Sequence, residues 1–330
     1  MRFYPSALPL LSLALLSSNL YAQQAHLVVA EKGQQSLAII DPAAGKVLAS
    51  VPEGGVTGHE VIASPDGRLA YVPIYGNSGV GKPGTDGSTM AVIDIASQKV
   101  IDTVTFPHPV RPHCPFFGPK DGLLYVSTEL DHTITQIDPK TLKIVGSIPT
   151  GQPESHMLAL SHDGLRGYTA NVGPGTVSVL DLVKRKTLAV IPISKETQRI
   201  SISNDDRWVF TSDQTKPQLA VIDTATNKVK SWVPLPGTGY GSAPTPDGRF
   251  LLVAVPPTNQ VAVVDLTTMQ VVRNIDVPSS PQEVLIRPDG KIAYVSCNTS
   301  GQVAAIDLSQ WTVQSLITAG KYADGLAWAK

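Results

Sequence analysis

Three histidines of this 330-residue chain occupy equivalent places in a repeated phrase. His59, His113 and His156 each precede, by seven or eight residues, the Asp of an Asp-Gly turn. Neutral imidazole is a common ligand of Zn²⁺, Cu²⁺ and Fe²⁺, so three converging rings predict a divalent-metal site, with Mn²⁺ as a further option. One coordination position would stay open to water, as in catalytic sites. The alternative is that the three rings line a channel and are bridged by ordered water.

Other polar residues near these positions could take part in catalysis. Glu60 and Glu129 could each serve as general base towards a bound water. Tyr75 stands at the start of a long insertion, and Arg111 and Arg199 could hold a carboxylate or an oxyanion. Taken singly, each of these residues has a simpler interpretation as a solvated loop residue, whereas their clustering favours a site.

Several familiar motifs are absent from the sequence. It holds no Gly-x-Ser-x-Gly elbow, no His-Glu-x-x-His, no dinucleotide fingerprint and no EF-hand loop. It also lacks Cys-x-x-Cys-His, which excludes covalent c-type haem. The insertion, residues 74–88, contains Gly76-x4-Gly81-Lys82, but Pro83 stands where a phosphate-binding loop needs Ser or Thr. We therefore interpret the insertion as a Gly-rich surface loop, either without function or folded over a site.

The phrase that holds the histidines recurs with a period near 42 residues. Its clearest copy, residues 240–277, has four short β-type runs separated by turn residues and shows no helical period. An acid ends the third run of every copy, at Asp41, Asp94, Asp138, Asp181, Asp223, Asp265 and Asp307. Four strands in such a period are typical of a propeller blade. The sequence thus predicts an all-β, seven-bladed β-propeller with four-stranded antiparallel blades.

The first copy lacks its first run, because residues 26–31, 36–41 and 46–51 supply only three strands. The C-terminal segment Ala323–Ala329 matches the missing run, so we expect it to complete the first blade and close the ring without exposed edges. It would place Ala323 approximately at the position that the histidines hold. First strands line the central channel, so the three imidazoles should face one another at its mouth.

Four segments carry a resemblance to a known family. They are Tyr71-Val72-Pro73, Tyr125-Val126-Ser127, Tyr168-Thr169-Ala170-Asn171 and Tyr294-Val295-Ser296. Each precedes a Val-Ile-Asp-like strand, and the chain resembles the YVTN or YncE-like seven-bladed propellers along almost its whole length. It is also similar, more distantly, to cytochrome d1-haem-domain-like and lactonase-like propellers. The resemblance implies the fold, and it implies no single activity because propellers host many.

The composition and the N-terminus bear on location and partners. Residues 1–22 form a predicted signal peptide with an apolar core at Leu8–Leu16, so we expect residues 23–330 to be one exported propeller domain, periplasmic or secreted. The net charge is −1 with scattered charges, which gives no case for nucleic acid, and no later segment could be a transmembrane helix. Cys114 and Cys297 fall in distant repeats and should be buried free thiols. We expect a monomer.

Two functions of different classes fit these features. The first is a metal-assisted, lactonase-like hydrolase or a lyase that acts on a small polar molecule at the channel mouth. The second is a non-catalytic propeller that uses the same face to bind a protein, a peptide or a glycan.

Overall fold

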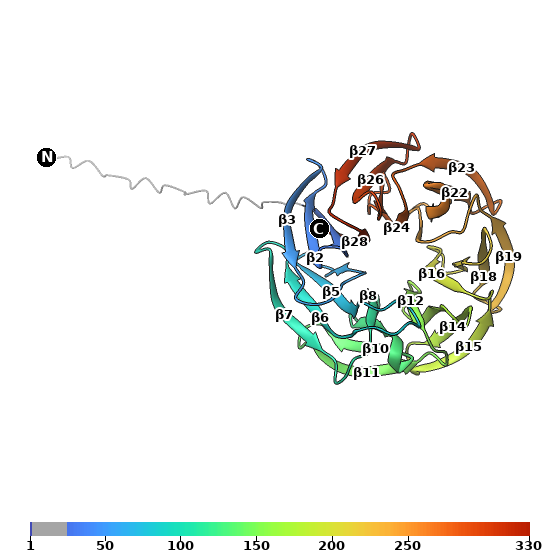
Figure 1. The fold of residues 1–330 in the computed structure, drawn as a ribbon, viewed down its shortest axis with the longest axis horizontal. Coiled ribbons are helices and arrows are strands. Elements are labelled where there is room, and N and C mark those ends of the chain that lie inside the picture. The colour runs from blue at the N-terminus through green and yellow to red at the C-terminus, as the bar shows by residue number, and fades with distance from the viewer. Residues whose placement is uncertain (2–24) are drawn as a thin grey trace.

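The structure, a computed structural model, describes Met1 and residues 25–330. It contains seven four-stranded antiparallel sheets, which stand as blades around a common axis (Figure 1). The predicted all-β, seven-bladed architecture is therefore confirmed. The predicted signal peptide, residues 1–22, lies outside the described residues apart from Met1.

In six blades the strand order from the axis outward follows the chain. These strands are β4 (Ile62–Ala63), β5 (Leu69–Gly76), β6 (Asp86–Asp94) and β7 (Lys99–Thr105); β8 (Pro112–Phe117), β9 (Leu124–Thr128), β10 (Thr133–Asp138) and β11 (Lys143–Pro149); β12 (Ser155–Leu160), β13 (Arg166–Asn171), β14 (Thr176–Asp181) and β15 (Lys186–Pro192); β16 (Thr197–Ile202), β17 (Trp208–Asp213), β18 (Gln218–Asp223) and β19 (Lys228–Pro234); β20 (Ser242–Pro244), β21 (Phe250–Val255), β22 (Gln260–Asp265) and β23 (Gln270–Asp276); β24 (Pro281–Ile286), β25 (Ile292–Cys297), β26 (Gln302–Asp307) and β27 (Thr312–Thr318). Two short 3₁₀ turns, η1 (Glu129–Asp131) and η2 (Pro256–Thr258), join second to third strands.

The first blade joins the two ends of the described chain. Its strands are β28 (Ala323–Ala329), β1 (His26–Glu31), β2 (Ser36–Asp41) and β3 (Lys46–Pro52), in that order from the axis. Leu27 of β1 pairs with Trp328 of β28, and Gly325 of β28 donates its N–H to the carbonyl of His59 in the next blade, at 2.9 Å. A Cβ at Gly325 would lie 2.6 Å from the Cα of Glu60, so only glycine permits this approach. The predicted closure of the ring is confirmed.

The strand patterns follow from how blades stack. Middle strands such as β2 and β22 are buried along nearly their whole length because neighbouring blades cover both faces, which explains their continuous apolar runs. Outer strands such as β15 alternate between exposed and half-buried residues. The core lies between blades: Val28 of the first blade and Val72 of the second pack in one cluster.

The recurring acids are turn residues. Asp247 Oδ1 accepts the N–H of Arg249 at 3.1 Å, and Asp265 Oδ1 accepts the N–H of Thr267 at 2.8 Å. Such bonds from Asp to the backbone two residues on stabilise tight turns, which accounts for the repeat of both acids. Cys114 and Cys297 are buried and free, as predicted. In the described part of the chain, no helix has the length and apolarity needed to cross a membrane.

Candidate functional site

The strand register fixes which residues share a level of the channel. Ser155 of β12 pairs with Asn171, Pro112 of β8 with Thr128, and Ala323 of β28 with Glu31, so the next residue of each inner strand is equivalent. This upper layer consists of His59, His113, His156, Gln198, Tyr240, Gln282 and Asp324. The structure thus corrects the expectation for the C-terminal strand: Ala323 is fully buried, and Asp324 holds the position. No Asp-Gly turn follows the C-terminal strand, so its sequence can be aligned with the other inner strands only to within one residue.

The three histidines do meet at one place, around Tyr75. The ring centre of Tyr75 lies 5.0 Å from that of His59, 5.2 Å from that of His113 and 5.5 Å from that of His156. The rings of His113 and His156 lie against each other at a tilt, with centres 3.6 Å apart and planes 31° apart. The prediction that these positions share one opening holds for all three, and β5 adds an aromatic ring to them.

Glu129 is the carboxylate behind this ring cluster. Its Oε2 accepts the hydroxyl of Tyr75 at 2.6 Å and lies 3.1 Å from Nδ1 of His156, and its Oε1 accepts Nη1 of Arg111 at 3.0 Å. Burial alone raises the pKa of Glu129, but hydrogen bonds from His156, Tyr75 and Arg111 outweigh it and lower that pKa. Glu129 is therefore ionised at neutral pH, and Nδ1 of His156 carries the hydrogen that it donates to Glu129.

Arg111 fastens the insertion over this side of the mouth. Its Nε donates to Asp86 at 2.6 Å, and its Nη2 donates to the carbonyl of Lys82 at 2.6 Å. The side chain is buried and lines a separate small cavity beneath the insertion, not the channel mouth. Arg111 thus holds the loop that follows Gly76 in place, and its guanidinium is not available to a ligand in the channel.

Glu60 and Arg199 lie one residue below the imidazoles, in a second layer. Nη1 of Arg199 donates to Glu60 at 2.6 Å and to Glu283 at 2.7 Å, while Nη2 donates to Asp324 at 3.3 Å. The guanidinium also lies 4.7 Å from the ring centre of Tyr240. Burial disfavours its charge, but Glu60 and Glu283 more than offset this and raise the pKa of Arg199. Arg199 therefore crosses the channel as a permanent cation.

The imidazoles themselves are neutral. Burial lowers the pKa of His113 well below its usual value, and the neighbouring His156 and His59 lower it further. Burial also lowers the pKa of His59, with Lys32 adding to the effect, and lowers that of His156 although Glu129 opposes it. The channel mouth thus offers three uncharged rings at neutral pH.

These side chains surround a cavity of about 510 Å³ above the second layer. Its lining adds Lys32, the insertion residues Asn77 and Ser78, and Asp324 to the imidazoles and Tyr75. Asn77 accepts the N–H of Thr85 through Oδ1, which leaves its amide hydrogens available to a ligand. Glu60 and Glu129 do not line this cavity, so neither can act directly as general base there.

A single metal ion requires imidazole lone pairs that converge on one point. A coordinated imidazole directs a lone pair within its ring plane at about 2.0–2.1 Å. The ring centres of His113 and His156 are only 3.6 Å apart and their planes are tilted by 31°, so the two rings pack against each other instead of approaching one ion from separate directions. Among residues 25–330, no group of three or more His, Cys, Asp and Glu side chains is placed to hold a metal ion. The rings as arranged do not fit one ion, and the divalent-metal prediction stays a prediction for metal analysis.

Besides Asp324, two charged residues of the site were not identified from the sequence. Glu283 directly follows Gln282, which belongs to the upper layer. Glu60 and Arg199 follow upper-layer positions in the same way, so the repeat could have pointed to Glu283 as well. Lys32 comes from the turn after β1, and its ammonium lies 3.6 Å from Asp324. No repeated signal marks that turn, so only the fold brings Lys32 to the mouth.

Comparisons with known proteins agree with this architecture. The model of the family described as Cytochrome D1 heme domain matches residues 119–244, which include Glu129, His156 and Arg199. Among solved structures, the chain is similar to the Pseudomonas aeruginosa periplasmic gluconolactonase PpgL, with 18% identity over 93% of this chain and 99% of that one and a TM-score of 0.73. The resemblance to cytochrome d1-like and lactonase-like seven-bladed propellers is confirmed.

Two further structures share the fold. The dihydro-haem d1 dehydrogenase NirN is 16% identical over 91% of this chain and 74% of that one, with a TM-score of 0.65. A chain of Kuenenia stuttgartiensis hydrazine synthase is 17% identical over 76% of this chain and 96% of that one, with a TM-score of 0.51. No curated protein sequence matches the chain. At these identities the structures establish the fold alone.

Proposed function

We propose that this protein is an exported propeller that hydrolyses a small polar lactone at its channel mouth, with His156 as general base. The pairing of Glu129 with Nδ1 of His156 carries the proposal, because it leaves Nε2 of a neutral ring as the free basic atom on the cavity side. The signal-like residues 1–22 and the structural similarity to a periplasmic gluconolactonase support export and the substrate class.

In this mechanism Nε2 of His156 takes a proton from a water molecule while the oxygen of that water attacks the lactone carbonyl carbon. Glu129 holds the ring and stabilises the imidazolium that forms. The amide of Asn77 and the ammonium of Lys32 are the donors available to the developing oxyanion. The C–O bond within the lactone ring then breaks, and the His156 imidazolium returns its proton to the leaving alkoxide. No step passes through a metal ion.

Hydrolysis of a panel of sugar lactones, followed by acid release in a pH-stat, tests this mechanism. His156→Gln should lower kcat/KM at least ~100-fold because the proton acceptor is lost. His162→Gln is the control and should leave the rate unchanged. His162 is exposed, lies just beyond the end of β12 that is far from His156, and is hydrogen-bonded to Asp206. Because the pKa of His156 is lowered, activity should be full at neutral pH and should fall only as acid protonates Nε2.

Two outcomes would contradict the mechanism. One is a panel in which no lactone is opened faster than in buffer, and the other is an unchanged rate in His156→Gln. A chelator arm addresses the metal alternative: activity lost on chelation and restored by Zn²⁺ or Mn²⁺ would show that the imidazoles rearrange to hold an ion.

The second candidate is binding without turnover, with a planar tetrapyrrole as ligand. The match to the Cytochrome D1 heme domain model over residues 119–244 favours it. Nδ1 of His113 is buried without a partner in the described structure, so one imidazole of the cluster is not committed to a hydrogen bond. His59 and His113 would contact the group, which could supply redox chemistry when bound.

Absorbance titration with haemin separates the two candidates. A saturable, one-to-one spectral change that is lost in His113→Ala and unaffected in His162→Gln would support binding. A change that is not saturable, or that survives in His113→Ala, would argue against a tetrapyrrole at this mouth.

A further inference from the structure

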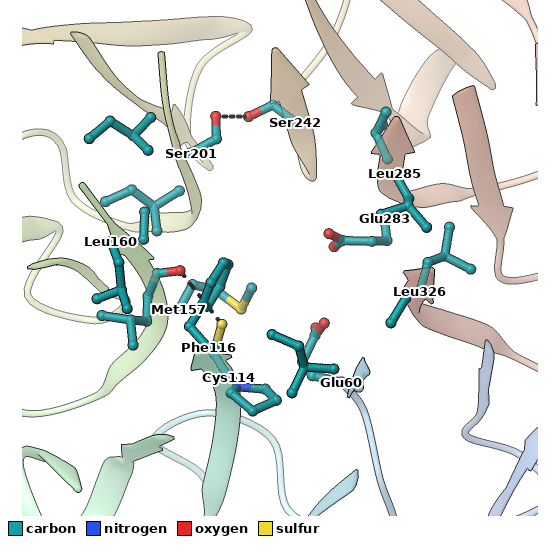
Figure 2. Close-up of a pocket in the computed structure, with 18 of the residues that line it drawn as sticks. Glu60, Cys114, Phe116, Met157, Leu160, Ser201, Ser242, Glu283, Leu285 and Leu326 are labelled. Atoms are coloured by element: carbon teal, nitrogen blue, oxygen red, sulfur yellow. Dashed lines mark hydrogen bonds between the residues drawn. The ribbon is translucent and has the colours of Figure 1, made fainter. Parts of the chain in front are cut away.

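A second cavity of about 450 Å³ lies on the other side of the Arg199 layer. Its walls are largely apolar, with Phe116, Met157, Leu160, Leu285 and Leu326 around the space (Figure 2). Figure 2 also shows the carboxylates of Glu60 and Glu283 pointing into that space. The cavity thus has an apolar body and an acidic inner end, and none of the residues proposed above for lactone hydrolysis lines it.

Each of the two carboxylates has one oxygen in use and one to spare. Nη1 of Arg199 binds Oε1 of Glu60 and Oε2 of Glu283. The remaining oxygen of each makes no hydrogen bond in the described part of the chain. Glu60 is only 6% exposed as a residue, but its spare oxygen remains accessible from the cavity. Both spare oxygens can therefore accept hydrogen bonds from a ligand that enters the cavity.

The charges of the layer do not balance. Arg199 faces three carboxylates, and the only other cation within ion-pair reach in the described chain, Lys32, contacts Asp324 on the upper side. The lower side therefore has two carboxylates for one shared guanidinium. Burial raises the pKa of Glu60 to about 8, with Arg199 opposing and Glu283 and Asp324 adding to the rise. Burial likewise raises the pKa of Glu283.

We propose that the lower cavity binds an apolar primary amine, with its ammonium between Glu60 and Glu283 and its hydrocarbon chain along Phe116, Leu160 and Leu326. The ammonium takes the place of the proton that the two glutamates otherwise hold and donates to the spare oxygens, which makes these hydrogen bonds charge-assisted. The chain length is limited by the cavity, and its removal from water adds affinity in proportion to the apolar area buried. A carboxylate-bearing ligand would meet two acids and be excluded. This site is independent of the proposed lactone chemistry.

Binding should be coupled to proton release. The charged or titratable groups that face Glu60 are Arg199, Glu283, Asp324, the phenol of Tyr240 and, from β8, the thiol of Cys114. Of these, Arg199 keeps its charge, so an incoming ammonium should displace the proton held by the two glutamates. Affinity for the amine should therefore rise as the pH increases from about 6 to about 8.

Isothermal titration calorimetry with hexylamine, 1-hexanol and hexanoate tests the site. Hexylamine should bind roughly 10- to 100-fold more tightly than hexanol. Its ammonium makes charge-assisted hydrogen bonds, which contribute more binding free energy than the neutral hydrogen bonds of a hydroxyl. Hexanoate should not bind. Titrations in two buffers of different ionisation enthalpy should show up to one proton released per amine at pH 7.

Matched variants locate the amine. Glu60→Gln and Glu283→Gln should each reduce the preference for hexylamine over hexanol at least ~tenfold. Glu53→Gln should not, because Glu53 is an equally buried acid that lines neither cavity. Glu60→Gln resembles the protonated side chain and keeps Arg199 paired with Glu283 and Asp324, so it is expected to fold. If it does not, Ala63→Phe, at the half-buried rim, should block hexylamine and leave the melting temperature nearly unchanged.

Three results would overturn the proposal. Equal affinity for hexylamine and hexanol would leave only an apolar cavity. An amine preference that persists in both glutamine variants would place the amine elsewhere. Absence of hexylamine binding across pH 6–9 would remove the site altogether. None of these results depends on lactone hydrolysis, since His156→Gln should bind hexylamine as the unaltered protein does.

Discussion

Glu53 shows what a single buried acid does in this fold. It lies directly after β3 and is only 3% exposed. Its Oε1 accepts the N–H of Gly58 at 2.5 Å, whereas Oε2 is buried without a partner in the described structure. Burial raises its pKa to about 7, the hydrogen bonds from Gly58 and Thr57 oppose this, and nearby Glu31 adds to it. The folded protein thus keeps Glu53 protonated where the unfolded chain would ionise it.

We expect Glu53→Gln to stabilise the protein progressively as the pH rises. A raised folded-state pKa contributes stability below about pH 4.5, and this contribution is lost as the pH increases to about 7. Glutamine does not ionise, so the free energy of unfolding of the variant should exceed that of the unaltered protein by up to about 3 kcal/mol at pH 7. Urea unfolding at pH 4.5, 6 and 7.5 measures this difference.

The control for this prediction is Glu196→Gln, at an exposed glutamate. Its free energy of unfolding should follow that of the unaltered protein at every pH. If Glu53→Gln gave the same offset at pH 4.5 and pH 7.5, Glu53 would not be the protonated group that the geometry requires.

At the residue scale, the sequence predicted positions better than roles. Repeat spacing alone placed His59, His113 and His156 around one opening, because equivalent inner-strand positions must converge in a propeller. It could not reveal that Glu129 lies behind the rings and binds Tyr75 and His156, because those contacts join three blades. A side chain's partners across a channel have no signature in a single repeat.

At the scale of elements, the strands were predictable because Asp-containing turns separate runs of β-branched residues. The insertion was less so: its length was evident, but not what fastens it. Arg111 contacts Asp86 on one strand and the carbonyl of Lys82 in the loop itself, and these contacts depend on the rotamer of one side chain. The structure favours the second of the two interpretations of the loop, since Asn77 and Ser78 line the channel-mouth cavity.

Arg111→Lys should loosen this loop without unfolding the blade. A lysine ammonium cannot reproduce the fork of donors to Asp86, Glu129 and the Lys82 carbonyl. Hydrogen exchange followed by mass spectrometry should show amides of residues 77–85 exchanging about tenfold faster, as expected when a charge-assisted hydrogen bond is lost. Peptides from β13 and β14 should be unchanged.

Arg166→Lys serves as the matched control, because Arg166 is exposed and its side chain makes no hydrogen bond in the described part of the chain. Residues 77–85 should exchange at the original rate in that variant. Equal exchange in Arg111→Lys and the unaltered protein would mean that the loop is held by its own backbone and not by Arg111.

At the scale of the whole molecule, the ring depends on one strand that arrives last. β28 pairs with β1, and its Leu326 packs with Tyr294 of the seventh blade. Deleting residues 323–330 should therefore leave an open edge on β1 and expose the core between the first and seventh blades. We expect the truncated chain to lose its cooperative thermal transition and to elute as aggregates in size-exclusion chromatography.

A circular permutant distinguishes the strand's pairing from its place in the chain. His26 pairs with Ala329, so the start of β1 and the end of β28 are already neighbours. Moving residues 320–330 to precede residue 25, with a short Gly-containing turn, would give the first blade the strand order along the chain that the other six blades have. The permutant should be monomeric and melt within a few degrees of the original, because every pair of strands is retained. If the permutant aggregated as the truncated chain does, the pairing of β28 with β1 would not be enough to hold the ring. The position of β28 at the C-terminal end of the chain would then be required as well.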